Sequence, residues 1–196
     1  MRHEIITSAI LAAWKQTVSY IASGHLAEFS SRYKESLVFR RVKSDLKNVS
    51  PDVRVELEVP FNRWEIDLVG SHEAEQVAVE GKFKLRGDGA VPDNRKAAFF
   101  DLYKLERYIS SGRYSRGLFM WLTDEEAYVR KATGDSANFS THQGRVYQPR
   151  TPLCARRSRN MMPLPLVLTR RYEFSWEKIL DSRWFILILN VAIPTG

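Results

Sequence analysis

Hydrophobic and polar positions repeat along the chain with two different periods. Apolar residues recur at helical spacing over Ile5–Ile21 and again from about Ser30 to Leu46, as on the buried face of an amphipathic helix. The period then becomes two over Val53–Val59, which predicts a half-buried strand with its valines and leucine on one face. Further strand-like runs follow over Trp64–Val69 and Gln76–Phe83, separated by a polar hairpin loop. The first half of the chain therefore predicts two helices and a three-stranded meander.

The second half begins with a glycine-containing loop over Leu85–Pro92. Asp93 or Asn94 is expected to cap the long amphipathic helix that follows. The uninterrupted apolar run Gly117–Thr123 is typical of a buried strand. A short helix is then expected over residues 124–131.

Periodicity is lost between Thr133 and Pro165, where we expect loops and a short strand at Arg145–Tyr147. Two closing elements are predicted over Tyr172–Ile179 and Trp184–Ile193. With 196 residues, of which 44% are hydrophobic, the chain is long enough to form one domain with a sizeable core. The predicted fold class is α/β of the α+β type, with a central mixed β-sheet flanked by helices.

Cysteine and histidine usage narrows the possible chemistry. The single cysteine, Cys154, excludes a disulfide within the chain and any cysteine-based zinc site, and it is typical of a protein from a reducing cytoplasm. The four histidines lack the spacing of a zinc-binding motif. The apolar run Trp184–Ile193 is shorter than the roughly 20 residues of a membrane-spanning helix. We therefore expect a soluble, cytoplasmic protein with no membrane partner.

The positive charge of the chain is concentrated in one segment. Lys and Arg number 30 against 23 Asp and Glu, which gives a formal charge of +7. Between Ser136 and Tyr172 there is no lysine and no acidic residue, but there are seven arginines, which account for the whole excess. They are Arg145, Arg150, Arg156, Arg157, Arg159, Arg170 and Arg171. Because guanidinium groups suit phosphate oxygens, the segment predicts a nucleic-acid interface; a solvated loop is the alternative.

The candidate chemistry lies in the second and third predicted strands. Asp67 stands between Ile66 and Leu68 in W-E-I-D-L-V, so it is expected to project from the face opposite to both. Glu80 follows thirteen positions later in V-A-V-E-G-K-F, with Lys82 on the same face of that strand. If the strands pair, the two carboxylates converge on one cation, and such oxygen ligands suit Mg²⁺, with the lysine beside the attacking water. A structural ion pair between Asp67 and Lys82 is the alternative.

This arrangement resembles the core of the PD-(D/E)XK nuclease superfamily, the restriction-endonuclease-like fold. The family's Pro-Asp is replaced by Ile66-Asp67, and glycine holds the middle position of E-x-K, where an apolar residue is more usual. The resemblance covers roughly residues 30–131 and implies a meander of three strands, then a crossover helix leading to a fourth strand beside the first. Residues 1–29 would be an accessory helix. Residues 132–196 would add the arginine-rich segment and the closing strands to the same domain.

The resemblance implies that Asp67 and Glu80 bind Mg²⁺ or Mn²⁺. It also implies that Lys82 orients or deprotonates the attacking water, or stabilises charge on the phosphate; a depressed pKa would help it act as a base. Many members carry a further acidic residue on the helix before the first strand, and Glu35 is the matching position. A first-turn glutamate that only favours the helix dipole is the alternative. Lys84 either touches phosphate or is a solvated edge charge. Other candidates are Glu58 and Glu65 at the site, and Asp101 and Lys104, for which a role in the fold is preferred.

We therefore expect a metal-dependent endonuclease that hydrolyses phosphodiester bonds in DNA, of restriction or repair type, with double-stranded DNA as its partner. Cleavage of both strands would require a homodimer or two binding events. Two other classes remain open: a catalytically inactive nuclease-fold protein that binds nucleic acid or a protein partner, and a basic adaptor for an acidic protein. Plasmid cleavage with Mg²⁺, compared with a Lys82→Ala control, separates the first two.

Overall fold

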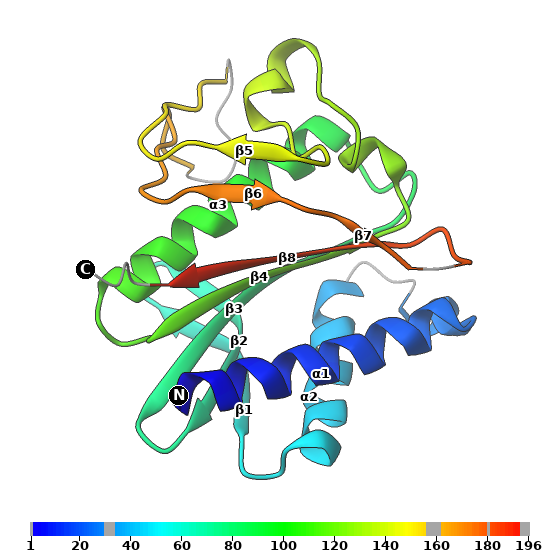
Figure 1. Ribbon diagram of the computed structural model, residues 1–196, viewed down its shortest axis with the longest axis vertical. Helices are drawn as coiled ribbons and strands as arrows, with labels where there is room; N and C mark the ends of the chain where they lie inside the picture. Colours follow the sequence, from blue (N-terminus) through cyan, green and yellow to red (C-terminus); the bar gives the residue numbers. More distant parts are fainter. Residues whose placement is uncertain (1, 30–33, 156–161, 180, 193–196) are drawn as a thin grey trace.

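The computed structural model describes residues 2–29, 34–155, 162–179 and 181–192. Within these residues a six-stranded mixed β-sheet has helices on both faces. A second, two-stranded sheet lies on the face that α3 covers (Figure 1). The helices are α1 (Arg2–Ala22), α2 (Lys34–Val49) and α3 (Val91–Ser110), with the 3₁₀ helices η1 (His25–Phe29), η2 (Glu126–Tyr128) and η3 (Gly134–Phe139). The strands are β1 (Arg54–Phe61), β2 (Trp64–His72), β3 (Glu75–Lys84), β4 (Arg116–Thr123), β5 (Arg145–Tyr147), β6 (Tyr172–Phe174), β7 (Glu177–Lys178) and β8 (Phe185–Ala192).

The central sheet has the strand order β1-β2-β3-β4-β8-β7. β1, β2 and β3 form the antiparallel meander that the sequence predicts. α3 then carries the chain to β4, which pairs in parallel with β3. The expectation of a fourth strand beside the first is wrong, because the meander leaves one edge of β3 unpaired and the crossover helix returns the chain to that edge. The α+β class, with a mixed sheet between helices, is confirmed.

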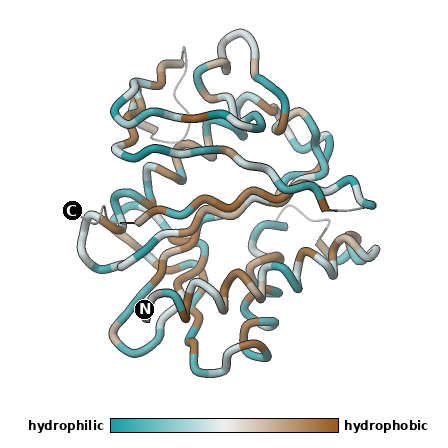
Figure 2. Tube along the Cα trace, viewed as in Figure 1, coloured by the Kyte–Doolittle hydropathy of each residue, from teal (hydrophilic) through white to brown (hydrophobic). Residues whose placement is uncertain are grey.

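Each face of the sheet has its own hydrophobic core. On one face, α1 and α2 pack against side chains such as Val79 and Leu118. On the other face, α3 and the β5–β6 sheet enclose a larger cluster that includes Phe99, Trp121 and Phe174. Figure 2 shows the apolar residues of the central strands and of α1 gathered at these interfaces. β4 is buried along nearly its whole length, which explains why its sequence is a continuous apolar run.

The long helix begins earlier than the sequence pattern predicts. α3 starts at Val91 with Ala90 as its N-cap, and the Ala90 side chain makes no capping hydrogen bond. The predicted caps, Asp93 and Asn94, lie inside the first turn. Pro92 fits that turn because its backbone has no N–H to leave unpaired.

The short helix expected over residues 124–131 is present only as the three-residue 3₁₀ helix η2. Glu125 is its N-cap, and its side chain accepts the N–H of Ala127 (3.0 Å). The predicted strand Arg145–Tyr147 is confirmed as β5. No helix in the described ranges is both long and apolar enough to cross a lipid bilayer.

The two closing segments divide between the two sheets. The first splits into β6, which pairs with β5, and β7, which pairs with β8 at the edge of the central sheet. β8 lies between β4 and β7. The apolar C-terminal run is therefore interior to the sheet.

Hydrogen bonds to Glu106 connect residues 169–172 to α3. Its buried carboxylate accepts the N–H and the hydroxyl of Thr169 at 2.8 and 2.9 Å. It also accepts the N–H of Arg170 (3.0 Å) and the hydroxyl of Tyr172 (2.9 Å). Four donors replace the water that the carboxylate loses on burial.

Glu106→Ala should lower the free energy of unfolding by about 3 kcal/mol or more, because buried donors lose their shared acceptor. Arg107→Ala, at the next and exposed position of the same helix, is the control and should change it by less than about 0.5 kcal/mol. Urea unfolding followed by tryptophan fluorescence measures both. Equal effects of the two substitutions would show that Glu106 is not the anchor.

Candidate active site

At Asp67 the regular alternation of side chains between the two faces of the sheet is interrupted in β2. Ile66 packs in the core beneath α3, whereas Leu68 packs in the core beneath α1 and α2. The expectation that Asp67 projects opposite to both is therefore wrong. On β1, Glu58 adopts a positive φ of 55°, and Val59 packs on the α3 side rather than with the earlier valines of the strand. A positive φ costs a non-glycine residue about 1–3 kcal/mol, and here it accompanies the change of face.

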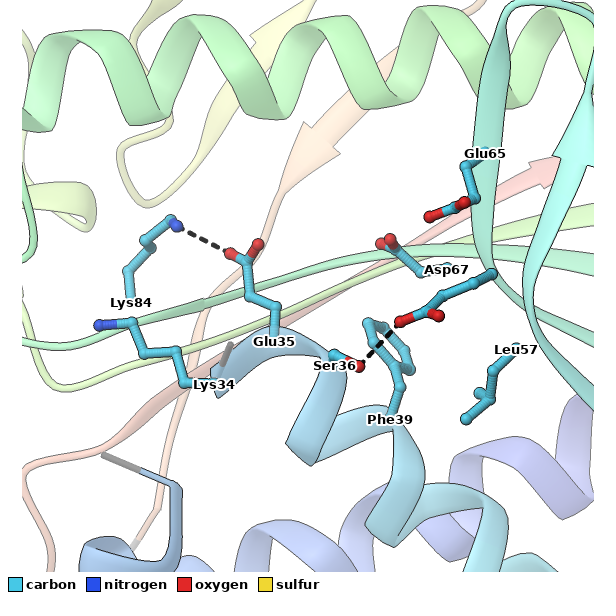
Figure 3. A pocket seen from close by; sticks show the side chains of 9 residues that line it. Lys34, Glu35, Ser36, Phe39, Leu57, Glu65, Asp67 and Lys84 are labelled. Atoms are coloured by element: carbon cyan, nitrogen blue, oxygen red, sulfur yellow. Dashed lines mark hydrogen bonds and ion pairs between the residues drawn. The ribbon is translucent and has the colours of Figure 1, made fainter. Parts of the chain in front are cut away.

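A cavity of about 270 Å³ lies beside this change of face, between the first turn of α2 and the strands (Figure 3). Four carboxylates and two ammonium groups from α2, β1, β2 and β3 share it. They belong to Glu35, Glu58, Glu65, Asp67, Lys34 and Lys84. The fold thus brings the predicted residues Glu35, Asp67 and Lys84 to one cavity, whereas Glu80 and Lys82 do not line it.

Gly81, the middle residue of E-x-K, sets how closely α2 approaches the sheet. A Cβ atom at this position would overlap the ring of Phe39 and lie 3.0 Å from the carbonyl oxygen of Met120. Phe39 lies one helical turn after Glu35 and lines the same cavity. The missing side chain therefore allows α2 to bring Glu35 and Ser36 up to Asp67, which explains glycine at this position of the motif.

Asp67 is held against the backbone of E-x-K. Its Oδ2 accepts the N–H of Gly81 at 2.8 Å, while its second oxygen accepts no hydrogen bond from any described residue. Burial raises the pKa of Asp67 to about 6, and the nearby ammonium of Lys82 only partly opposes that effect. The carboxyl group is thus poised to change protonation near neutral pH.

Glu80 turns towards α3 and does not line the cavity. Its side chain is 1% exposed, with one oxygen accepting the hydroxyl of Tyr108 (2.9 Å) and the other the ammonium of Lys104 (2.6 Å). Burial and the negative charge of Asp67 raise the pKa of Glu80 well above its usual value. Asp67 and Glu80 therefore interact electrostatically, but each has its own hydrogen-bond partners.

Lys82 also faces α3, where it forms an ion pair with Asp101. Asp101 pairs in turn with Lys104 (2.9 Å), so the ammonium and carboxylate groups form one buried chain from Lys82 to Glu80. Burial would lower the pKa of Lys82, but the carboxylates of Asp101, Glu35 and Asp67 raise it above its ordinary value. The depressed pKa that would help Lys82 act as a base is therefore not found, and its ammonium group stays protonated.

Three residues of α3 thus belong to the site more closely than the sequence indicates. Asp101 and Lys104, which the sequence analysis assigns to the fold, contact Lys82 and Glu80 directly. Tyr108 is not predicted at all. The sequence contains one sign of this arrangement. The three residues are spaced three and four positions apart, which places their polar groups on one otherwise apolar face of the helix.

Glu35 is more than a first-turn glutamate on α2. Its Oε1 pairs with the ammonium of Lys84 at 2.8 Å and accepts the N–H of Phe83 at 3.3 Å. Lys84, which was expected to contact phosphate or solvent, therefore forms an ion pair with Glu35 of α2 (Figure 3). At the other end of the cavity, Glu58 accepts the hydroxyl of Ser36 at 2.9 Å.

The donor set suits a hard divalent cation. Carboxylate oxygens are the ligands that Mg²⁺ takes, and one oxygen of Asp67 faces no competing donor among the described residues. In the described part of the chain, no three Asp, Glu, His or Cys side chains are grouped closely enough to hold a metal ion. Glu80 in particular is committed to Lys104 and Tyr108. The carboxylate chemistry fits such a cation, and Asp67 has one oxygen that no described donor occupies.

Two of the predicted nucleic-acid-binding arginines, Arg145 and Arg150, do not line this cavity. Arg145 belongs to β5 and is partly buried, and Arg150 is exposed in the turn that follows, with a φ of 62°. Both belong to the layer that covers α3 (Figure 1). Arg156, Arg157 and Arg159 fall outside the described residues.

A scan of protein-family models and searches of curated proteins and of solved structures found no match to this chain.

Asp67→Asn should stabilise the protein at pH 8 by roughly 2–3 kcal/mol and have little effect at pH 4. The folded-state pKa of about 6 exceeds the usual 3.8, so the stabilising effect of the protonated carboxyl is complete below pH 4 and is lost as the pH rises through about 6. Urea unfolding at both pH values in EDTA measures the difference. A structural ion pair with Lys82 requires the opposite result, a destabilised variant at pH 8.

Gly81→Ala should destabilise the protein by about 1–3 kcal/mol, because the new methyl group overlaps Phe39. Phe39→Leu should relieve the overlap, so the double variant should be more stable than the sum of the two single effects. Urea unfolding of the four proteins measures this coupling. Strict additivity would show that α2 does not approach the sheet at Gly81.

Proposed function

We propose that this protein is a metal-dependent nuclease that hydrolyses phosphodiester bonds in DNA. The observation that carries the proposal is the hydrogen bond from the N–H of Gly81 to Asp67. It joins the carboxylate of β2 to the E-x-K segment of β3, at a cavity that carries three more carboxylates. Buried acidic groups with raised pKa values beside a protonated lysine support the assignment of a catalytic site.

We further propose that α2, the meander, α3 and β4 form a restriction-endonuclease-like core. The order of a helix, three antiparallel strands, a crossover helix and a parallel strand supports this assignment. So does the position of the acidic residues, at the middle of β2 and β3 rather than in loops. The departure is the placement of β4 beside β3 instead of beside β1.

Mg²⁺ or Mn²⁺ would be held by Asp67 together with carboxylates that share its surroundings, and Glu80 would join only by releasing Lys104 or Tyr108. When bound, the cation would polarise a phosphate oxygen and make a water molecule more acidic. Glu35 and Glu58 are the neighbouring oxygen donors, placed by the first turn of α2 and the end of β1.

Asp67 is assigned to the cation rather than to proton transfer, because a bound cation would lower the pKa of about 6 that its carboxyl group has in the cation-free protein. Lys82, kept protonated by Asp101, Glu35 and Asp67, supplies fixed positive charge for the developing negative charge on the phosphate. Asp101 and Lys104 act through Lys82 and Glu80 and are positioning residues.

The partner that fits the charge distribution is nucleic acid, with double-stranded DNA as the proposed substrate. The arginine-rich segment would contact backbone phosphates, since Arg145 and Arg150 are available at the surface layer over α3. Cutting both strands would need a homodimer or two binding events. A reducing cytoplasm is the proposed location, on the evidence of one exposed free cysteine, Cys154.

Asp67→Asn and Lys82→Met should each reduce Mg²⁺-dependent cleavage of plasmid DNA by about 10²-fold or more. The first removes a charged ligand of the divalent cation, and the second removes the fixed positive charge of Lys82 while keeping the apolar stem. Glu56→Gln is the matched control, because Glu56 is an exposed carboxylate of β1 outside the cavity. Gel electrophoresis of supercoiled, nicked and linear plasmid measures the rates.

Circular dichroism of each variant shows whether a lost rate reflects lost structure. Cleavage that survives both substitutions would refute the assigned roles. Wild-type protein that cuts no duplex, single-stranded or branched DNA with Mg²⁺ or Mn²⁺ would favour the inactive, binding-only class.

A further inference from the structure

A second, basic cleft of about 450 Å³ lies beyond the carboxyl ends of the parallel strands β3 and β4, where α3 begins. The carboxyl ends of parallel strands are where α/β proteins commonly bind ligands. Its charged lining residues are Arg86, Arg95, Arg130, Lys131, Glu125 and Glu126. Four cations thus face two carboxylates, and none of these residues belongs to the Asp67 cavity.

Arg95 forms the buried part of this cleft and has no acidic partner. Its side chain is 5% exposed, and Nη2 donates to the carbonyl oxygens of Ala127 and Arg130. Nε is buried without a partner, and Nη1 makes no hydrogen bond with the described residues. No carboxylate among those residues forms an ion pair with the guanidinium. Burial accordingly lowers the pKa of Arg95.

A buried positive charge that only carbonyl dipoles compensate is unfavourable unless an anion completes the site. The two carboxylates of the cleft are already engaged. Glu126 pairs with Arg130 at 2.6 Å, and Glu125 accepts the N–H of Ala127 at 3.0 Å. The positive end of the dipole of α3, a helix whose N-cap has no side-chain hydrogen bond, adds to the local potential.

We propose that this cleft is a binding site for a phosphoryl group. Arg95 would meet the phosphate oxygens at the floor, and the exposed Arg86 and Lys131 would close over them from the rim. Guanidinium groups match phosphate geometry better than ammonium groups do. The phosphoryl group belongs either to the backbone of a bound nucleic acid or to a small phosphorylated molecule. The inference does not depend on cleavage.

Isothermal titration calorimetry in EDTA, with no divalent cation, tests the site with two probes, a short DNA duplex and pyrophosphate. The test protein carries Arg86→Gln and Lys131→Gln, both at exposed rim positions. Arg54→Gln is the matched control, because Arg54 is exposed at the opposite end of the sheet, in line with the start of β3.

If the source is a nucleic-acid backbone, the rim variant should bind the duplex more weakly, and its logarithmic salt slope should fall by about two. If the source is a small molecule, pyrophosphate should bind the wild type and the control but not the rim variant, with duplex affinity unchanged. Rim-variant binding equal to that of Arg54→Gln for both probes would overturn the proposal.

Arg95→Met probes the floor of the cleft directly. If circular dichroism shows that it folds, it should lose the same binding as the rim variant, and a folded Arg95→Met protein that binds both probes like the wild type would also overturn the site. If it does not fold, the rim variant still decides. Loss of plasmid cleavage leaves these binding results untouched, so the two proposals fail separately.

Discussion

The close approach of α2 to β3 at Gly81 determines the geometry of the candidate active site. The missing Cβ admits the ring of Phe39, and the backbone N–H of the same residue holds Asp67. One residue thereby fixes α2, β2 and β3 relative to one another. Glu35, one turn before Phe39, reaches the cavity only because this contact is so close. A larger residue at position 81 would separate the acidic groups that the site requires.

On the side of β3 that faces α3, ion pairs rather than apolar packing hold the side chains of the strand in place. Glu80, Lys104, Asp101 and Lys82 form a buried chain in which each group has an opposite charge beside it. Such a chain is costly to desolvate and costly to interrupt. It sets the protonation of Lys82 and keeps Glu80 away from the Asp67 cavity. α3 is therefore both the crossover between parallel strands and the element that holds the two charged residues of E-x-K, Glu80 and Lys82.

The middle of β2 and β3 and the carboxyl ends of β3 and β4 carry different electrostatic surroundings. Carboxylates dominate the cavity at the middle of β2 and β3, whereas cations dominate the cleft beyond the carboxyl ends. A chain that places acidic groups for a cation and basic groups for phosphate along one sheet is suited to an anionic polymer. This combination connects the proposed nuclease site with the proposed phosphoryl site, although each rests on its own contacts.

The sequence by itself determined the three long helices, the meander and the buried strand, because hydrophobic period and residue type are local properties. It also named Asp67, Glu80 and Lys82 as candidate residues. It also located Glu35, from its position on the helix before the first strand. It did not place β4, which depends on a free sheet edge. It also missed the reversal of faces at Asp67, the role of Tyr108 and the pKa of Lys82. Those features arise from packing between segments far apart in the chain, where burial and neighbouring charges, rather than residue type, decide orientation and protonation.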